Sequence, residues 1–363
     1  MATATFARRV GAAISKGSSS WYDPHMEAAS RAILERIPFV DLTVEIRDAR
    51  IPLSSAYNQP SHVESSSKRM IVLNKMDLAD RSQTQKWMRH FQQQNCICYG
   101  VNSHNKDNIK EFLKFIQAQI RELKVGQSNY TATVLLIGIP NVGKSAIANS
   151  LHQIGRISAA EKGKLKHAIV SPLPGGTKDI SSFKIASHPN IYVLDTPGVL
   201  APEVLDVEMG SKLALTGAID DCLVGECELA MYFLAILNSN DEYKQWGKLN
   251  ARQDDTLSLD DKEKSLAGSH MNKRRKQYPT DHTQDFIVGD VRRMLFSTIS
   301  SFEGNLEDPK DMERLIKNQF LALHEAFRVP LEPGEDGNRT VATKLLNLFR
   351  TGRLGHYTLD HVS

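Results

Sequence analysis

Apolar positions along the chain follow two alternating patterns. Short runs of branched apolar residues have the length and composition of buried strands, at 39–46, 69–74, 96–101, 131–138 and 191–195. The stretches after them show the 3.6-residue period of amphipathic helices, at 82–94, 105–124 and 144–154. Another helix begins at Asp23-Pro24, an N-cap followed by proline, and runs to about Arg36. This alternation predicts an α/β fold with a doubly wound, mostly parallel sheet.

The pattern changes after about residue 205, where strand signals stop. Helical periods continue at 208–219, 226–238, 284–300, 308–327 and 340–351. From about 248 to 282 the chain is polar and almost without large apolar residues, so it cannot bury enough surface to offset its ordering entropy. We therefore expect an α/β domain over 23–215 and a smaller helical domain over 216–363, with a mobile insertion at 248–282.

The first 22 residues differ in composition from the rest. Lys and Arg number 45 against 42 Asp and Glu, and Arg8, Arg9 and Lys16 account for the whole excess of +3. This leader is rich in Ala and Ser, contains no acid and spaces Phe6 and Val10 along one helix face. It predicts an organellar transit peptide over 1–22, without fixed structure; a frayed N-terminus is the alternative.

Apolar runs and cysteine spacing exclude two other classes. Since no run of 18 apolar residues occurs, no membrane span is predicted, although peripheral association with a membrane stays open. Cys96, Cys98, Cys222 and Cys227 fit neither a disulfide framework nor a usual zinc spacing. We expect buried free thiols.

The sequence GIPNVGKS, Gly138 to Ser145, matches GxxxxGK[ST] between a predicted strand and helix. Gly138 and Gly143 let backbone N–H groups approach phosphate oxygens, and the helix N-terminus adds partial positive charge. Lys144 would reach the β- and γ-phosphates, and the Ser145 hydroxyl would bind Mg²⁺. The predicted phosphate-binding residues are Asn141, Val142, Gly143, Lys144, Ser145 and Ala146.

Two later segments complete a triphosphate site. Asp195 begins DTPG directly after a strand, where its carboxylate can hold the Mg²⁺ shell, while the Gly198 amide can contact a γ-phosphate. Thr177, in the glycine-rich LPGGTKD, can offer its hydroxyl to the same Mg²⁺. Lys144 and Thr177 are therefore catalytic candidates.

The sequence NKMD, Asn74 to Asp77, follows a predicted strand and has the donors and acceptors to read guanine. Asp77 can accept from guanine N1–H and the exocyclic amine, Asn74 can pair with N7, and the Lys75 stem can lie over the ring. Adenine offers no matching donor pair, so this site would select GTP. Asn102 and Ser103, after the next strand, are placed to support the base from a second loop.

The order of these motifs is reversed. In ordinary guanine-nucleotide domains the phosphate loop precedes the base-reading motif, whereas here Asn74 lies 64 residues before Gly138. Since the termini of a domain usually lie close together at its surface, a circularly permuted P-loop GTPase domain can still close its sheet.

These motifs together resemble the circularly permuted GTPases of the YlqF/RbgA family, which includes mitochondrial ribosome-associated GTPases. The resemblance rests on WYDPHM at 21–26, RDARIPLSS at 47–55, NKMD, GIPNVGKS, LPGGT, LDTPGV and GRLGHYTLD at 352–360. Asp48-Ala49-Arg50 matches the family's DAR signature.

The resemblance implies further site residues. Val199 stands where Ras-like enzymes have the glutamine that positions water, and His25 corresponds to the histidine that takes this task in the family. Here Asp23-Pro24 replaces the family's Pro-Gly before that histidine, and a local hydrogen bond in an early helical turn is an equal alternative for His25. Asn141 matches an asparagine that coordinates K⁺ in relatives; a role in stabilising the loop is the alternative.

The resemblance also implies a function. It is that of a monomeric, GTP-hydrolysing assembly factor for the large ribosomal subunit of an organelle. Its intrinsic rate is low and is stimulated by that subunit, whose rRNA and proteins are its partners. We expect the mitochondrion, with the plastid as the alternative. Two other hypotheses remain: a GTP-controlled protein-binding switch with negligible turnover, and an RNA chaperone whose nucleotide site is vestigial.

Overall fold

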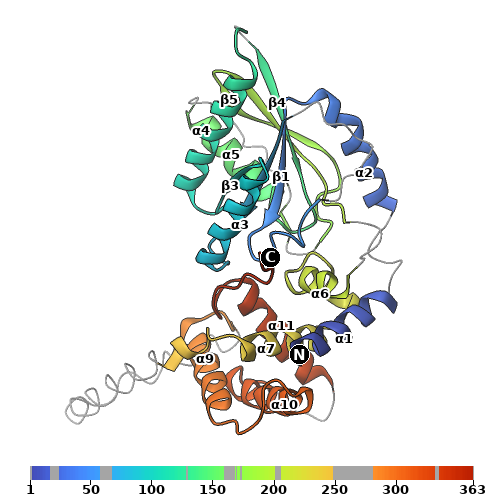
Figure 1. Ribbon diagram of the computed structural model, residues 1–363, viewed down its shortest axis with the longest axis vertical. Coiled ribbons are helices and arrows are strands. Elements are labelled where there is room, and N and C mark those ends of the chain that lie inside the picture. Colours follow the sequence, from blue (N-terminus) through green and yellow to red (C-terminus); the bar gives the residue numbers. More distant parts are fainter. Residues whose placement is uncertain are drawn as a thin grey trace, which may run out of the picture. The chain divides into compact units, whose positions relative to one another are not determined.

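The chain forms two compact units in the computed structural model (Figure 1). The structure describes residues 2–16, 24–57, 68–127, 130–158, 168, 170–171, 174–200, 206–247, 281–331 and 335–362. The sheet unit contains Ala13–Leu223 and His356–Ser363, and the helical unit contains Met1–Ala12 and Val224–Gly355. Each unit is therefore built from two separate stretches of the chain.

The sheet unit is built on six strands in the order β3-β2-β1-β4-β6-β5. Their bounds are β1 Leu42–Asp48, β2 Lys68–Asn74, β3 Ile97–Gly100, β4 Thr131–Ile137, β5 Ser181–Ser187 and β6 Asn190–Asp195. All neighbouring pairs are parallel except β5 with β6, which is antiparallel. The predicted doubly wound, mostly parallel sheet is confirmed.

Helices cover both faces of this sheet. The α2 helix (Pro24–Arg36) packs on β4 through Ala29 and Ile33, and α3 (Arg81–Gln93) packs on β2 through Trp87. The other face carries α4 (Lys106–Leu123), whose Phe112 stacks on Tyr99 of β3, and α5 (Lys144–Ser158). The α5 helix lies so close to β5 that a side chain at Gly155 would collide with the Ile185 carbonyl.

The topology brings the predicted motifs together. Because five strands run parallel, their carboxyl ends share one edge of the sheet. Asp48, Asn74 and Asp195 are the last residues of β1, β2 and β6, and the phosphate loop follows β4 directly. The helix α6 (Val207–Leu215) and a short 3-10 helix, Asp221–Leu223, end this part of the chain.

The helical unit contains α7 (Glu226–Ser239), α9 (Asp285–Ser300), α10 (Pro309–Ala326) and α11 (Glu335–Arg350). Its core holds a reciprocal amide pair, in which Asn238 Nδ2 donates to Gln319 Oε1 at 3.0 Å and Gln319 Nε2 donates back at 2.7 Å. Phe233 of α7 packs against Phe349 of α11. A smaller helical domain after the sheet was predicted and is present.

The expected lack of fixed structure in the leader is wrong for residues 2–16, which form a helix, α1 (Ala2–Lys16). The assignment of the leader as a transit peptide stays a prediction. Phe6 and Val10 are buried. Arg9 forms an ion pair with Glu228 at 2.9 Å, and the hydroxyls of Thr3 and Ser239 share a hydrogen bond. The apolar spacing that suits an imported amphipathic peptide also lets this helix complete the core of the helical unit. Leader residues 17–22 lie outside the described residues.

The domain boundaries also differ from the expected 23–215 and 216–363. The sheet unit extends to Leu223, and the chain returns to it at His356. The strand β5 was not predicted, because SSFKIAS is too polar to show a strand pattern and lies at the edge of the sheet. The insertion expected at 248–282 lies almost entirely outside the described residues.

Candidate phosphate and guanine site

The phosphate loop between β4 and α5 has the backbone that its glycines permit. Gly138 and Gly143 have φ of 150° and 93°, and a side chain at Gly143 would collide with the Asn74 amide. Asn141 also has a positive φ, 59°. The loop therefore curls so that its N–H groups and the start of α5 face one pocket.

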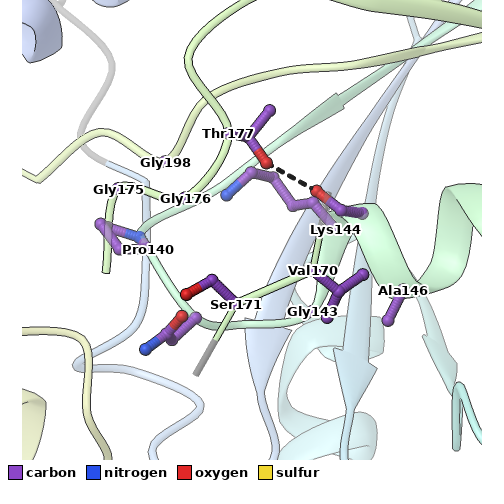
Figure 2. Close-up of a pocket in the computed structure, with 12 residues that line it drawn as sticks. Pro140, Gly143, Lys144, Ala146, Val170, Ser171, Gly175, Gly176, Thr177 and Gly198 are labelled. Atoms are coloured by element: carbon purple, nitrogen blue, oxygen red, sulfur yellow. Dashed lines mark hydrogen bonds between the residues drawn. The ribbon is translucent and has the colours of Figure 1, made fainter. Parts of the chain in front are cut away.

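Figure 2 shows that pocket, which the phosphate loop lines together with Thr177 and Gly198. From the predicted set it contains Asn141, Gly143, Lys144, Ser145, Ala146, Thr177 and Gly198. Sequence reasoning missed Pro140, Val170, Ser171, Gly175 and Gly176 as lining residues. Gly175 and Gly176 directly precede Thr177 in LPGGTKD, and this glycine-rich composition was the available signal.

Three predicted magnesium ligands meet beside this pocket. The hydroxyls of Ser145 and Thr177 lie 2.9 Å apart, drawn as the dashed line in Figure 2. The Asp195 carboxylate is fully buried, and neither of its oxygens accepts a hydrogen bond within the described part of the chain. Two hydroxyls and an unsatisfied carboxylate are oxygen donors of the kind Mg²⁺ prefers, so the residues fit the ion.

The pKa values of Asp195 and Lys144 at this position are shifted by burial. Burial raises the pKa of Asp195 more than the nearby Ser145 hydroxyl and Lys144 ammonium lower it. Burial also lowers the pKa of Lys144 to about 8, against the opposing effect of Asp195. The Lys144 ammonium donates to the carbonyls of Gly138 and Ile139, at 3.0 and 2.8 Å. A polyphosphate would give this buried cation the countercharge that it needs.

The DTPG segment approaches the phosphate loop closely. A side chain at Gly198 would collide with the backbone of Pro140, and Val199 N–H donates to Gly138 at 3.4 Å. The Val199 side chain is buried in a cluster with Ala29 and Ile33 of α2. Val199 therefore contributes packing and no group that could orient water.

Asn74 occupies the predicted edge but its contacts differ from those expected. It is fully buried, donates from Nδ2 to the Val142 carbonyl at 2.8 Å and accepts at Oδ1 from Ser103 N–H at 3.2 Å. Each end of its amide thus makes one contact within the protein. Because Nδ2 carries two N–H donors, the expected contact with guanine N7 stays a prediction. Asn74 joins the base-reading loop, the phosphate loop and the second loop.

The other base-reading residues are placed separately. Asp77 is exposed, whereas Lys75 has a left-handed φ of 61° and its ammonium lies 2.9 Å from Asp48 Oδ2. Ser103 accepts at its carbonyl from Ser150 of α5, and Asn102 accepts from His104 N–H. The contact of Lys75 with Asp48 was not foreseen, since the strand register that creates it is not visible in the sequence.

The residues predicted for K⁺ and for water are Asn141, in the phosphate loop, and His25, in α2. Asn141 donates from Nδ2 to the Gly217 carbonyl at 2.6 Å, so its amide is oriented by the turn after α6. His25 is exposed in the first turn of α2 and is not among the residues that line the pocket.

Other candidate chemistry is limited. All four cysteines are free, as expected. Only Cys98 is buried, which raises its pKa to about 12; Cys96 and Cys227 are half-buried and Cys222 is exposed, so the expectation of buried thiols was wrong for these three. Among the described residues no cluster of His, Cys, Asp and Glu could hold a metal ion. None of the helices in the described ranges has the length and apolar character to cross a membrane.

Comparison with known proteins agrees with this geometry. Residues 133–259 match the family described as 50S ribosome-binding GTPase. The whole chain is 58% identical to DAR GTPase 2, mitochondrial, of Arabidopsis thaliana, and covers 98% of it. It is 30% identical to Ribosome biogenesis GTPase A of Bacillus pumilus, over 77% of this chain and 96% of that protein. The crystal structure of GNP-bound YlqF from T. maritima aligns with 92% of this chain and 100% of that one, with 21% identity and a TM-score of 0.42.

The full-length similarity and the reversed order of a complete set of GTPase motifs lead to one assignment. The chain belongs to the circularly permuted GTPases of the YlqF/RbgA family and, within it, to the DAR GTPases.

Proposed function

We propose that this DAR GTPase hydrolyses GTP in order to assemble the large subunit of the mitochondrial ribosome. The observation that carries the enzymatic part is the meeting of Ser145, Thr177 and the unsatisfied Asp195 carboxylate beside the phosphate loop. The ribosomal part rests on relatives that are named for ribosome biogenesis and, in the most similar sequence above, for the mitochondrion. The plastid remains the alternative compartment.

In this proposal the chain's own residues hold the triphosphate. The loop amides of Asn141 to Ala146 and the Lys144 ammonium bind the β- and γ-phosphates, and Lys144 exchanges its carbonyl partners for phosphate oxygens. Ser145, Thr177 and Asp195 would hold Mg²⁺, whose charge would neutralise the phosphate oxygens. Gly198, packed on Pro140, offers its amide to the γ-phosphate.

Guanine is read at the neighbouring loops. Asp77, exposed at the edge, accepts the two guanine donors, and the Lys75 stem lies over the ring. Asn102 and Ser103 support the base from the second loop. Asn74 holds the loops in place through its two contacts within the protein, and its second Nδ2 N–H pairs with guanine N7.

Water activation is assigned to His25. Its position is four residues before Ala29, on the same face of α2, and Ala29 packs in the cluster that contains Val199. The helix that carries His25 therefore adjoins the segment after DTPG. We expect His25→Ala to lower ribosome-stimulated turnover by about 10²-fold with GTP affinity unchanged. Glu27→Ala, two residues along the same exposed turn, serves as the control; full activity of His25→Ala returns His25 to a structural role.

Asn141 is proposed as a K⁺ ligand. Asn141 lines the phosphate pocket, and it matches the asparagine that coordinates K⁺ in relatives. Replacing K⁺ by Na⁺ should slow hydrolysis in the wild-type protein and have no effect on Asn141→Ala. Equal rates in both salts for the wild-type protein would remove the ion from the mechanism.

The central experiment measures GTP hydrolysis with and without purified mitochondrial large subunits, together with cosedimentation in GTP and GDP. We expect GTP-dependent cosedimentation and stimulation of a slow basal rate, and loss of both in Lys144→Ala. Tight GTP binding without stimulation or cosedimentation would favour the protein-binding switch. Absence of GTP-selective binding would favour the chaperone with a vestigial site.

A further inference from the structure

The DAR signature contacts the base-reading motif through neighbouring strand ends. Asp48 ends β1 directly opposite Asn74, which ends β2, and Ala49 N–H donates to the Asn74 carbonyl at 2.8 Å. This register places the Asp48 carboxylate beside the next residue of NKMD. Lys75 Nζ lies 2.9 Å from Asp48 Oδ2.

Arg50 holds the Asp48 carboxylate independently of Lys75. Arg50 donates to both of its oxygens, from Nε at 3.0 Å and from Nη2 at 2.7 Å, and Arg50 N–H also donates to Oδ1. Asp48 and Arg50 are each 2% exposed. Burial raises the pKa of Asp48, but the positive charges of Arg50 and Lys75 lower this pKa by more than burial raises it. The carboxyl therefore stays ionised well below its usual pKa. The group is a rigid buried anion.

Lys75 has a backbone that needs such a partner. Its φ of 61° lies in the left-handed region, which is unfavourable for a residue with a long side chain and persists where the surroundings enforce it. The residues around it are anchored too, since Asn74 is bonded to Val142 and Met76 N–H donates to Val101. Within this fixed loop, Asp77 is the exposed member.

The loop that carries Asp48 is itself held by the terminal motif. Leu359 N–H donates to the Arg50 carbonyl at 2.7 Å, and Tyr357 N–H donates to the carbonyl of Leu78, the residue after NKMD. The segment GHYTLD therefore touches the DAR loop and the base-reading loop together.

We propose that Asp48 is a positioning residue for guanine nucleotide: it holds Lys75 in its left-handed conformation, so that the lysine stem covers the base and Asp77 faces it. This inference rests on the proposed role of NKMD in reading guanine. It assigns to the DAR signature a task in nucleotide affinity, through Lys75 and without contact with the nucleotide.

The test is a double-mutant cycle measured by fluorescent GDP and GTP titration. Asp48→Asn removes the charge at nearly constant volume, and Lys75→Met keeps the stem without the ammonium. We expect each to weaken GDP and GTP alike by about tenfold, and the double variant to bind no more weakly than Lys75→Met, because contacting residues are not additive. At saturating GTP the hydrolysis rate of Asp48→Asn should stay within about twofold of wild type, because Asp48 does not contact the nucleotide.

Asp41→Asn is the matched control. Asp41 lies at the opposite end of the same strand, pairs with Lys124 at 2.6 Å and accepts from Thr133 N–H at 2.8 Å. The Asp41→Asn variant thus loses an aspartate–lysine contact that is far from the edge of the sheet formed by the carboxyl ends of the strands. Its GDP affinity should equal that of the wild-type protein even where its thermal stability falls.

Several outcomes overturn the inference. They are unchanged affinity in Asp48→Asn, additive losses in the double variant, or an equal loss in Asp41→Asn. If Asp48→Asn does not fold, Lys75→Arg decides: it retains a cation for Asp48 and should bind within about twofold of wild type while Lys75→Met loses tenfold; equal binding by both contradicts the proposal. Failure of the wild-type protein to prefer guanine nucleotides would instead count against the proposed function.

Discussion

At the scale of single residues, the site is defined by groups whose hydrogen bonds or charges are incomplete. The buried Asp195 carboxylate lacks hydrogen-bond donors within the described residues, and the buried Lys144 ammonium has only carbonyl partners at hydrogen-bond distance. Unsatisfied buried groups destabilise a fold, by about 1–3 kcal/mol each for a lost partner. A bound triphosphate with its cation would satisfy both, which couples nucleotide binding to stability.

The lowered pKa of Lys144 gives the binding reaction a pH dependence. Its ordinary pKa is 10.5 and its value in the folded protein is about 8, so the lysine loses its proton as pH rises through 8. Phosphates favour the charged form, and nucleotide binding above pH 8 must therefore take up a proton. We expect GDP affinity to fall by up to tenfold per unit between pH 8 and 9.

Calorimetry in buffers of different ionisation enthalpy measures this uptake directly. The same pKa shift makes folding stability in the absence of nucleotide rise from pH 8 towards 10.5, because the unfolded chain binds the extra proton there. Lys144→Met should abolish both effects. A proton uptake at pH 8.5 that persists in this variant would assign the titration to another group.

The exposed Asp77 carries the prediction for base selectivity. Asp77→Asn should shift preference from guanine towards xanthine nucleotides, because the amide can donate to the xanthine O2 where a carboxylate cannot. Competition of GTP and XTP for a fluorescent nucleotide measures the ratio, which we expect to change by at least about 10²-fold. Unchanged selectivity for GTP would contradict the assignment of Asp77 to the base.

At the scale of elements, α1 is a structural part of the helical unit. Its face with Phe6 and Val10 is buried, and its polar side forms the pair of Arg9 with Glu228. The composition that predicts a transit peptide and the packing seen here are compatible, since both require one apolar helical face. An amphipathic period alone does not say which apolar surface a helix meets.

Removing the Phe6 ring should therefore destabilise the helical unit. We expect Phe6→Ala to lower the free energy of unfolding by about 3 kcal/mol, as for other buried aromatic residues. Urea denaturation followed by circular dichroism gives the value, with Arg8→Ala, on the exposed side of the helix, as the control. Equal stability of the two variants would show that α1 is not part of the folded core.

The elements differ in how far the sequence predicts them. The strands β1, β2, β4 and β6 and the helices between them follow from hydrophobic period and caps, such as the Asp80 side chain that accepts from Gln83 N–H at the start of α3. The edge strand β5 has too few apolar residues to be found. Within the site, motif spacing identifies the phosphate-loop residues, but the contacts of Asn74 and of Lys75 depend on strand register, which only the fold determines.

At the scale of the whole molecule, the segment that carries the DAR signature meets the end of the terminal motif GRLGHYTLD in the sheet unit. Asp360, 2% exposed, accepts from the N–H groups of Leu53 and Ser54 at 2.8 Å and from the Ser54 hydroxyl at 2.7 Å. It also pairs with Lys212 of α6 at 3.1 Å. The end of GRLGHYTLD therefore contacts RDARIPLSS, although the two motifs lie about 300 residues apart in the sequence.

Neutralising this carboxylate should weaken the sheet unit. We expect Asp360→Ala to reduce the free energy of unfolding by about 3 kcal/mol, because Lys212 and the loop amides lose their buried partner. His361→Ala, at the exposed next position, is the control. Nucleotide titration of Asp360→Ala shows whether the substitution also weakens binding at the base-reading loop. If Asp360→Ala is as stable as His361→Ala, the contacts of Asp360 do not stabilise the sheet unit.

The discontinuous sheet unit also sets an order of events during synthesis. A nascent chain that has emerged through Leu223 contains every nucleotide-binding motif, yet the segment that closes the DAR loop follows only after the entire helical unit has been made. Until then Leu53, Ser54 and Lys212 of α6 lack the carboxylate of Asp360. Translation thus separates the appearance of the GTPase motifs from the completion of the domain that holds them.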